Sequence, residues 1–305
     1  MALRFYDVGY LTAIADAVRA DLGLDGALTL PQMAEKIPQM VAIPAELKLS
    51  REAAQEYGAT FATGEGKLIQ ESHITALADA VRARYGITGN MTLPEMAGHM
   101  NSFRTGWLQR DDVPFYNKNG IDLGIAASTE YSLSFDCCAS NGMSCPISAL
   151  ALSDSNYRIC AGFYPTSNKV LLCWTNVKTD NGRGKVLDAA TQINLKKPFS
   201  VNISPVEDGV SCKLSLSQVG MEGYIESISG HQSPEWGTYK LFYYTPNFNM
   251  RAGAIRNIRI IGGGALLHHF VPVKVHGDST PYLFDVATGG VIAVDDSTIH
   301  FVDSV

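Results

Sequence analysis

A stretch of 24 residues occurs twice in this chain, at 11–34 and again at 74–97, with 15 identical positions. In each copy apolar residues recur every three or four positions before a glycine, which predicts an amphipathic helix ending at Gly23 or Gly86. Capping boxes at Thr29 and Thr92 predict the start of a second helix. A unit of about 30 residues buries too small a core alone, so each copy should pack on its twin, another chain or a larger assembly.

The pattern changes after about residue 103. Helical periodicity gives way to short alternating or apolar runs separated by turn signals, and about 200 residues of this kind predict an all-β antiparallel sandwich of jelly-roll type. We therefore expect a multidomain chain. Its parts are helical repeat 1 at 1–41, a linker at 42–72 with room for one short helix, helical repeat 2 at 73–102, and the β-sandwich at 103–305.

Composition excludes several classes of partner. A formal net charge of −6 does not favour binding to nucleic acid or to an anionic membrane surface, since both attract basic proteins. No apolar run approaches the roughly 20 residues that span a bilayer, and the N-terminus lacks a secretory apolar region. The sequence thus predicts a protein made in soluble form in the cytoplasm, without membrane insertion.

Cysteine and histidine do not indicate a metal site. We expect the cysteines to be small reduced residues of a sheet core, with Cys137 and Cys138 pointing to opposite faces of one strand. The side chains of neighbouring His268 and His269 should also diverge. We therefore predict no metal site. The six cysteines are Cys137, Cys138, Cys145, Cys160, Cys173 and Cys212.

The sequence contains no short motif that is typical of a catalytic site. The chain has neither GxSxG nor HExxH, and the adjacent Asp295 and Asp296 lie on opposite sides of an extended backbone. The glycine run 262–264 is not followed by a helix signal, which favours a hairpin turn over a phosphate-binding loop. We predict no enzymatic activity, although a facing carboxylate pair of the glycosidase kind remains an alternative.

The C-terminal strands resemble a known module. Ala254-Ile-Arg-Asn-Ile-Arg-Ile-Ile, then Phe270-Val-Pro-Val-Lys274, then Leu283-Phe-Asp-Val-Ala-Thr-Gly289 resemble the closing strands of concanavalin-like (laminin-G-like) sandwiches found in phage tail and baseplate proteins. The match departs from the family pattern at His269, where an acidic residue is common, and in the glycine run. The N-terminal copies independently resemble short repeats of phage tail proteins that read roughly L-T-x-I-A-D-A-I-R…G…M-T-P-x-x-M-A.

These resemblances imply a saccharide site. Lectin-type sites stack an aromatic ring on a sugar and surround it with amide, carboxylate and guanidinium groups. Trp236, flanked by Pro234 and Gly237, is expected at the surface, whereas Trp174 has an alternative place in the core. Calcium bound to Asp180 and Asn181 is an alternative to an ordinary turn, and no other cofactor is expected. The candidates are Trp174, Asn176, Asp180, Asn181 and Arg183, together with His231, Trp236 and Tyr239.

The resemblances imply a receptor-binding protein of a phage tail or baseplate. Its helical repeats would attach it to other tail proteins or to its own copies, and its sandwich would bind a host-surface glycan. Localisation in the virion and, by analogy with tail fibres, a homotrimer follow from this interpretation. A purely structural tail or decoration protein is the alternative, and it predicts that Trp174 and Trp236 are buried. A polysaccharide depolymerase is a third class.

Overall fold

The computed structural model divides the chain into two compact units, which are described separately. The helical unit comprises residues 1–106 with 273–280, and the sandwich unit comprises 107–272 with 281–305. The described residues are 3–44, 47–111, 120–139, 144–150, 152, 158–175, 185–188, 193–206, 211–219, 221–229, 235–243 and 253–305. At 150, 158, 171, 173–175, 185–188, 211 and 221–229 the backbone alone is described.

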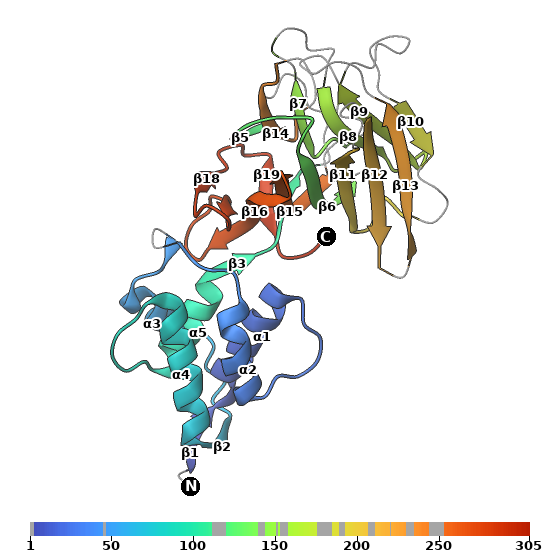
Figure 1. Ribbon diagram of the computed structural model, residues 1–305. Coiled ribbons are helices and arrows are strands. Elements are labelled where there is room, and N and C mark those ends of the chain that lie inside the picture. The colour runs from blue at the N-terminus through green and yellow to red at the C-terminus, as the bar shows by residue number, and fades with distance from the viewer. Residues whose placement is uncertain are drawn as a thin grey trace. The chain divides into compact units, whose positions relative to one another are not determined.

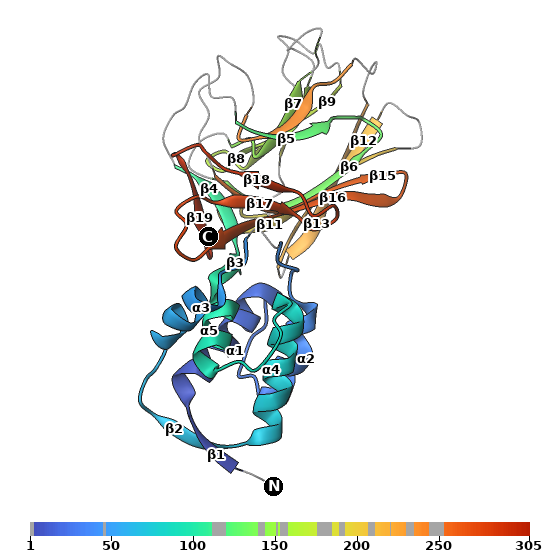
Figure 2. The same cartoon turned by 90° about the vertical axis from the view of Figure 1, so that its left-hand side faces the viewer.

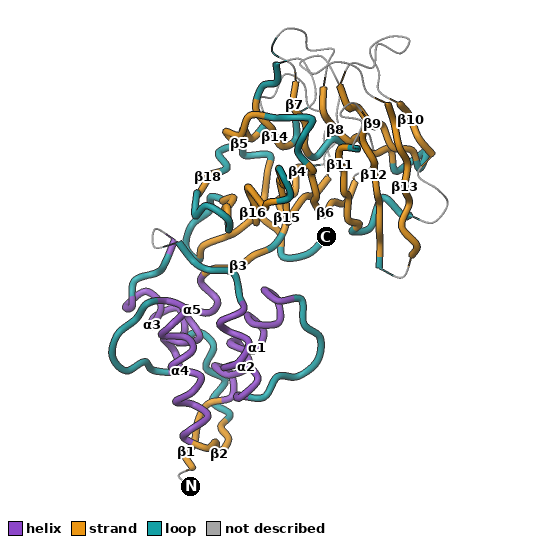
Figure 3. The backbone as a smooth tube through the Cα atoms, viewed as in Figure 1, coloured by secondary structure: helices purple, strands orange, loops and turns teal. Residues whose placement is uncertain are grey.

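In the helical unit, helices occur where the sequence predicts them, and Figure 3 shows them in purple. The helices are α1 (Val8–Leu22), α2 (Leu30–Lys36), the short 3-10 helix η1 (Ile37–Gln39), α3 (Arg51–Ala59), α4 (Glu71–Tyr85) and α5 (Leu93–Ser102). Both α1 and α4 end at a left-handed glycine, Gly23 and Gly86, and both capping boxes are formed, by Thr29 with Gln32 and by Thr92 with Glu95.

The two copies interlock. Helix α1 of the first copy packs mainly on α5 of the second, and α2 packs on α4, so each copy completes the other's core. Buried Ile14 and Val18 lie on the α1 face, with Leu77 and Val81 on α4. Short strands β1 (Leu3–Asp7) and β2 (Gly66–Gln70) pair antiparallel and join the starts of α1 and α4. Packing on the twin is thus the arrangement that the structure shows.

The predicted linker contributes to this unit. Helix α3 lies at Arg51–Ala59, begins at the N-cap Ser50 and packs against α5, while Arg51 forms an ion pair with buried Glu95. Arg51–Ala59 and Gly66–Gln70 of the predicted linker therefore form a helix and a strand of the helical unit, and the expectation of a spacer is wrong for these residues. The end of β16 (Ala265–Val275) also joins the unit, because Val273–Val275 pairs with β3 (Phe103–Thr105).

The sandwich unit has two antiparallel sheets. The smaller has the order β10-β9-β8-β7-β14-β5, and the larger is ordered β13-β12-β11-β6-β15-β16-β17-β18, with β4 and β19 joined through β15 (Figures 1 and 2). The smaller sheet comprises β5 (Ile121–Ala126), β7 (Ile147–Leu150), β8 (Arg158–Tyr164), β9 (Lys169–Thr175), β10 (Lys185–Asp188) and β14 (Thr238–Leu241). The larger adds β4 (Trp107–Arg110), β6 (Ser132–Ala139), β11 (Phe199–Pro205), β12 (Ser211–Gln218), β13 (Met221–Ser229), β15 (Gly253–Gly262), β17 (Tyr282–Asp285), β18 (Val291–Ala293) and β19 (Ile299–Val302).

One apolar core lies between the two sheets. Strand β6 alternates half-buried and buried residues along its length, as expected for a strand with one face on a core. Phe163 of the smaller sheet meets Phe199 of the larger edge to face, with ring centroids 5.0 Å apart. The predicted two-layer antiparallel sandwich is therefore present, and it begins at Trp107.

Two sequence predictions concern the larger sheet. Gly263 and Gly264, both with positive φ, form the β15–β16 hairpin turn predicted for the glycine run. Cys137 is fully buried, whereas the thiol of Cys138 lies on the other face and donates to the carbonyl of Lys196 at 3.1 Å. Both are free thiols, as are buried Cys145 and Cys212. Burial raises the pKa of Cys137, Cys138 and Cys212, which keeps these thiols protonated.

Candidate functional site

The two predicted ligand-binding aromatics on and before β14 are buried. Tyr239 is 0% exposed and Trp236 is 9% exposed, and both belong to the core between the sheets. The hydroxyl of Tyr239 donates to the carbonyl of Ser128 at 3.2 Å, so its polar end is also occupied. The prediction that Trp236 lies at the surface is wrong. A strand has one inward and one outward face, and flanking proline and glycine do not reveal which face an aromatic residue takes.

The other predicted site residues are not placed by the structure. Asn176, Asp180, Asn181, Arg183 and His231 lie outside the described residues. The backbone of Trp174 pairs with Ile159 of β8, but its side chain is likewise outside the description. Of the predicted site, the structure therefore describes the side chains of Trp236 and Tyr239 and the backbone of Trp174.

The opposite face of β14 carries a polar cluster that the sequence reading missed. Because Tyr239 and Leu241 point into the core, Thr238 and Lys240 point outward. Lys240 pairs in register with Asp122 of β5 on one side and with Ser148 of β7 on the other. We call Asp122, Thr238, Lys240 and Tyr243 the outer-face cluster of the smaller sheet.

Contacts within the outer-face cluster converge on Asp122. The hydroxyl of Thr238 donates to Asp122 Oδ2 at 2.8 Å, and the ammonium of Lys240 lies 3.7 Å from the same oxygen. The amide of Gly124 donates to Asp122 Oδ1 at 2.8 Å and so fixes the carboxylate. Lys240 Nζ also lies 5.3 Å from the centre of the Tyr243 ring. A carboxylate, an ammonium, a hydroxyl and an aromatic ring are thus held together on one face.

The cluster is open to solvent. The side chain of Asp122 is 49% exposed and that of Lys240 is 30% exposed, so their ion pair adds little to stability. Partial burial raises the pKa of Tyr243, which keeps its phenol neutral at physiological pH. Such groups can donate to and accept from hydroxyl groups of a ligand while the ring packs on an apolar patch.

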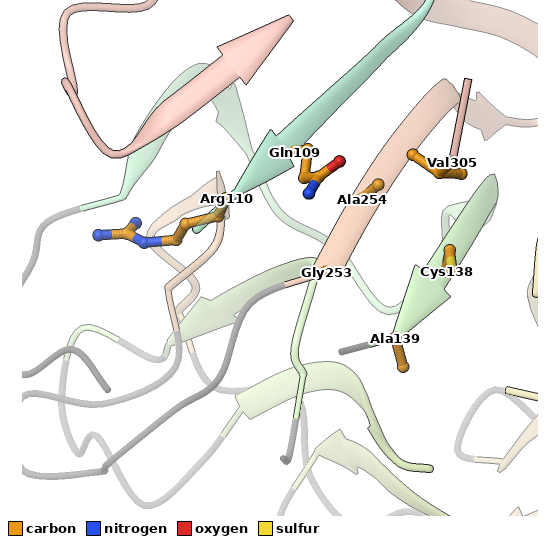
Figure 4. A pocket seen from close by; sticks show the side chains of 7 residues that line it. All are labelled: Gln109, Arg110, Cys138, Ala139, Gly253, Ala254 and Val305. Atoms are coloured by element: carbon orange, nitrogen blue, oxygen red, sulfur yellow. The ribbon is translucent and has the colours of Figure 1, made fainter. Parts of the chain in front are cut away.

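A small hollow of about 230 Å³ lies at the start of β15, beside the ends of β4 and β6 (Figure 4). Gln109, Cys138 and Ala254 are among its lining residues, and Figure 4 shows the Arg110 guanidinium directed away from the others. Burial lowers the pKa of Arg110, and its ion pair with Asp296, 3.2 Å long, opposes that shift. Since the raised pKa of Cys138 keeps the thiol protonated, this hollow holds no activated nucleophile among its lining residues.

The motif Leu283-Phe-Asp-Val-Ala-Thr-Gly289 builds a hairpin turn. Asp285, 2% exposed, accepts from the amide of His269 at 2.8 Å, the amide of Ala287 at 3.1 Å and the hydroxyl of Thr288 at 2.6 Å. His268 Nδ1 lies 2.7 Å from Oδ2 of Asp285, the same oxygen that accepts from Thr288, whereas the two amides donate to Oδ1. Asp285 thus fixes the conformation of this turn, which accounts for its place in the motif.

Neither a metal site nor a membrane-spanning helix is found within the described ranges. There, no group of three or more His, Cys, Asp and Glu side chains is placed to hold a metal ion. His268 binds Asp285, whereas Nε2 of His269 is buried without a hydrogen-bond partner, so the two rings diverge as predicted. No described helix is long and apolar enough to cross a membrane.

Comparison with known proteins gives distant matches only. No family model matches the chain, and no curated protein sequence matches it. The solved structures that resemble it include the CBM40 of a Ruminococcus gnavus IT-sialidase, with a TM-score of 0.31, 10% identity and coverage of 48% of this chain and 90% of that one. The same module was solved bound to alpha2,3 sialyllactose, with a TM-score of 0.30, 11% identity and coverage of 48% and 89%.

Carbohydrate binding module CBM66 from Bacillus subtilis has a TM-score of 0.31 and 15% identity, covering 50% of this chain and 94% of that one. A protein of unknown function from Shewanella oneidensis MR-1 has a TM-score of 0.27 and 8% identity, covering 56% and 79%. The description of this chain as a β-sandwich rests on its own strand pairing and core.

Proposed function

We propose that this chain is a phage tail- or baseplate-associated protein whose sandwich unit binds a host-surface saccharide. The sequence resemblances to concanavalin-like tail modules and to tail repeats support the viral assignment. The outer-face cluster carries the binding assignment, because Asp122, Thr238, Lys240 and Tyr243 gather hydrogen-bonding groups beside a neutral ring on an open sheet face. Binding is reversible, and no bond is made or broken.

The helical unit attaches the chain to other tail proteins or to its own copies in this proposal. Its two copies already bury one another, so attachment uses their outer surfaces. A homotrimer in the virion gains affinity by avidity from weak single sites. Light scattering on the purified chain tests the oligomer, since one copy has a mass of 33.0 kDa.

A glycan array probed with the whole chain tests saccharide binding. We expect retention of a defined class of glycans by the wild-type chain and its loss in Lys240→Met, which keeps the side-chain length but removes the ammonium. Lys213→Met is the matched control, because exposed Lys213 lies on β12 of the larger sheet. An array that is silent for the wild-type chain, or equal retention by Lys240→Met, contradicts the proposal.

A structural tail or decoration protein is the second candidate, and one observation favours it. The burial of Trp236 in the sandwich core is what a purely structural role predicts for that residue. The two candidates differ in the outer-face cluster, which a structural protein would cover with a neighbouring subunit. A third class, a depolymerase, predicts release of shortened fragments from host polysaccharide incubated with the chain. No release is expected.

A further inference from the structure

A second hollow lies in the helical unit, between α3 and the turn at 276–279. Its volume is about 820 Å³, within the range of small-molecule sites of about 300–1,000 Å³. Ala53, Glu56, Tyr57 and Thr60 line one wall, and their spacing places them on one face of α3. The lining also includes Leu49 and the turn residues His276, Gly277, Asp278 and Ser279. We call this hollow the helix–turn groove.

Both walls of the helix–turn groove are fixed. Helix α3 lies so close to α5 that a β carbon on Gly58 would overlap the backbone of Pro94. The turn is held by the amide of His276, which donates to the carbonyl of Ser102 at 2.7 Å, and Gly277 supplies a positive φ of 83°. Asp278 Oδ1 accepts from the amide of Thr280 at 2.8 Å. A groove with fixed walls loses little entropy when a ligand binds.

An aromatic pair joins the two walls. The rings of Tyr57 and His276 stack with centroids 3.4 Å apart and an interplanar angle of 9°. Phe61 meets Tyr57 edge to face at 5.2 Å, which holds the tyrosine ring in place. Burial lowers the pKa of His276, and nearby Arg104 lowers it further, so the imidazole is neutral at physiological pH. The groove therefore presents an uncharged aromatic surface.

The polar groups of the groove are mainly acceptors. Glu56 and Asp278 supply carboxylates, and Thr60 and Ser279 supply hydroxyls. Among the described lining residues no lysine or arginine is present to pair with an anion. Leu49 and Ala53 add apolar surface beside the rings. A matching ligand has one apolar face, several hydroxyl donors and no negative charge, which is the chemistry of a neutral sugar ring.

We propose that the helix–turn groove is a second saccharide site, which takes an uncharged sugar unit on the Tyr57–His276 pair with its hydroxyls donating to Glu56 and Asp278. The groove shares its ligand class with the proposed function of the sandwich but none of its residues. The two sites can therefore fail separately. Occupation of both sites by glycans of one surface would add avidity within a single chain.

Histidine-selective NMR on the whole chain tests this proposal. The probes are cellobiose, maltose, lactose and N,N′-diacetylchitobiose, with digalacturonic acid as the acidic counterpart, and the His276 ring signals are identified with His276→Gln. We expect saturable shifts of these signals with at least one neutral disaccharide. The acidic probe should bind more weakly, because it meets two carboxylates.

Charge reversal on α3 gives the matched variants. Glu56→Lys places a cation in the groove and should weaken binding by about tenfold or more, whereas Glu52→Lys on the same helix should leave it unchanged. Lys240→Met should keep the His276 response, which separates this site from the outer-face cluster. Absence of a His276 response to every neutral probe, or equal binding by Glu56→Lys, overturns the proposal even if the sandwich binds glycan.

Discussion

Gly98 of α5 lies in direct contact with the backbone carbonyl of Ala54 of α3, so that a β carbon at position 98 would overlap that oxygen. The reciprocal contact is made by Gly58 of α3 against the carbonyl of Pro94. Two glycines thus allow two helix backbones to touch. This crossing incorporates the segment between the sequence copies into the helical core.

Replacing Gly98 with alanine should destabilise the helical unit. Alanine favours the helix by about 1 kcal/mol over glycine, but crowding at a packed contact costs about 1–3 kcal/mol or more where backbone must move. We expect a net loss of about 1–2 kcal/mol, measured by urea unfolding followed at 222 nm. Gly290→Ala is the control, because a β carbon there meets only the Thr288 hydroxyl at 3.4 Å. Unchanged stability in Gly98→Ala would disprove the close crossing.

His99 should make the helical unit sensitive to acid. The residue is 2% exposed, and neither ring nitrogen has a hydrogen-bond partner among the residues that the structure describes. Burial lowers its pKa below that of a histidine in the unfolded chain. The unfolded chain therefore binds a proton at His99 more readily than the folded chain does. The free energy of unfolding is at its full value above about pH 6.5. It falls by about 1 kcal/mol per pH unit as the pH drops from there toward the pKa of His99 in the folded chain.

The variant His99→Leu removes this titration. We expect a stability equal to or above that of the wild-type chain at neutral pH, because no hydrogen bond is lost, and a smaller loss between about pH 7 and pH 5. Denaturant unfolding at each pH measures both quantities. The same acid sensitivity in both chains would show that other groups cause it.

Loss of the Asp285 carboxylate should destabilise the sandwich unit. Asp285→Ala leaves the amides of His269 and Ala287 and the hydroxyl of Thr288 without their acceptor, at a cost of about 3 kcal/mol in the free energy of unfolding.

The contribution of Asp285 should also depend on pH. Burial acts to raise the pKa of Asp285, but the hydrogen bonds from Thr288, His269 and His268 outweigh burial, and the pKa is lowered. This stabilisation is therefore present above about pH 4 and is lost as the pH falls below that value. Thermal unfolding of Asp285→Ala against Asp295→Ala, an exposed neighbour, measures the effect.

The two capping boxes should contribute unequally. Thr29→Ala removes one N-cap and should cost about 1 kcal/mol. Thr92→Ala should cost more, because its partner Glu95 also pairs with Arg51 of α3. Thermal unfolding compares both variants with Thr12→Ala, an exposed position within α1 where no cap is lost. An equal cost for both caps would show that the Arg51–Glu95 pair is independent of the cap.

Local signals in the sequence located much of the fold. The caps at Thr29 and Thr92 and the glycines at 23 and 86 act within a few residues, so helix bounds can be read from them. Alternation along β6 likewise identifies a strand with one buried face. The crossing of Gly58 and Gly98 could not be read, because it joins segments about 40 residues apart and leaves only two unremarkable glycines in the sequence.

The predicted site residue Tyr239 faces the core, whereas the outer-face cluster lies on the opposite face of the same strand, β14. The sequence predicts that Tyr239 contacts a ligand, but alternation along β14 turns Tyr239 inward and Lys240 outward. Aromatic side chains fit both a sugar site and a core, so their identity does not decide the face. Asp122 lies 118 residues before Lys240, and only the pairing of β5 with β14 brings the two together.

The most direct test of the account is the dissociation constant of the best array glycan for the whole chain, measured by calorimetry for wild type, Lys240→Met and Lys213→Met. We expect Lys240→Met to weaken binding by about tenfold or more, the equivalent of about 1.4 kcal/mol, while Lys213→Met matches the wild type. Identical constants for the three chains would show that the outer face of β14 does not contact the saccharide.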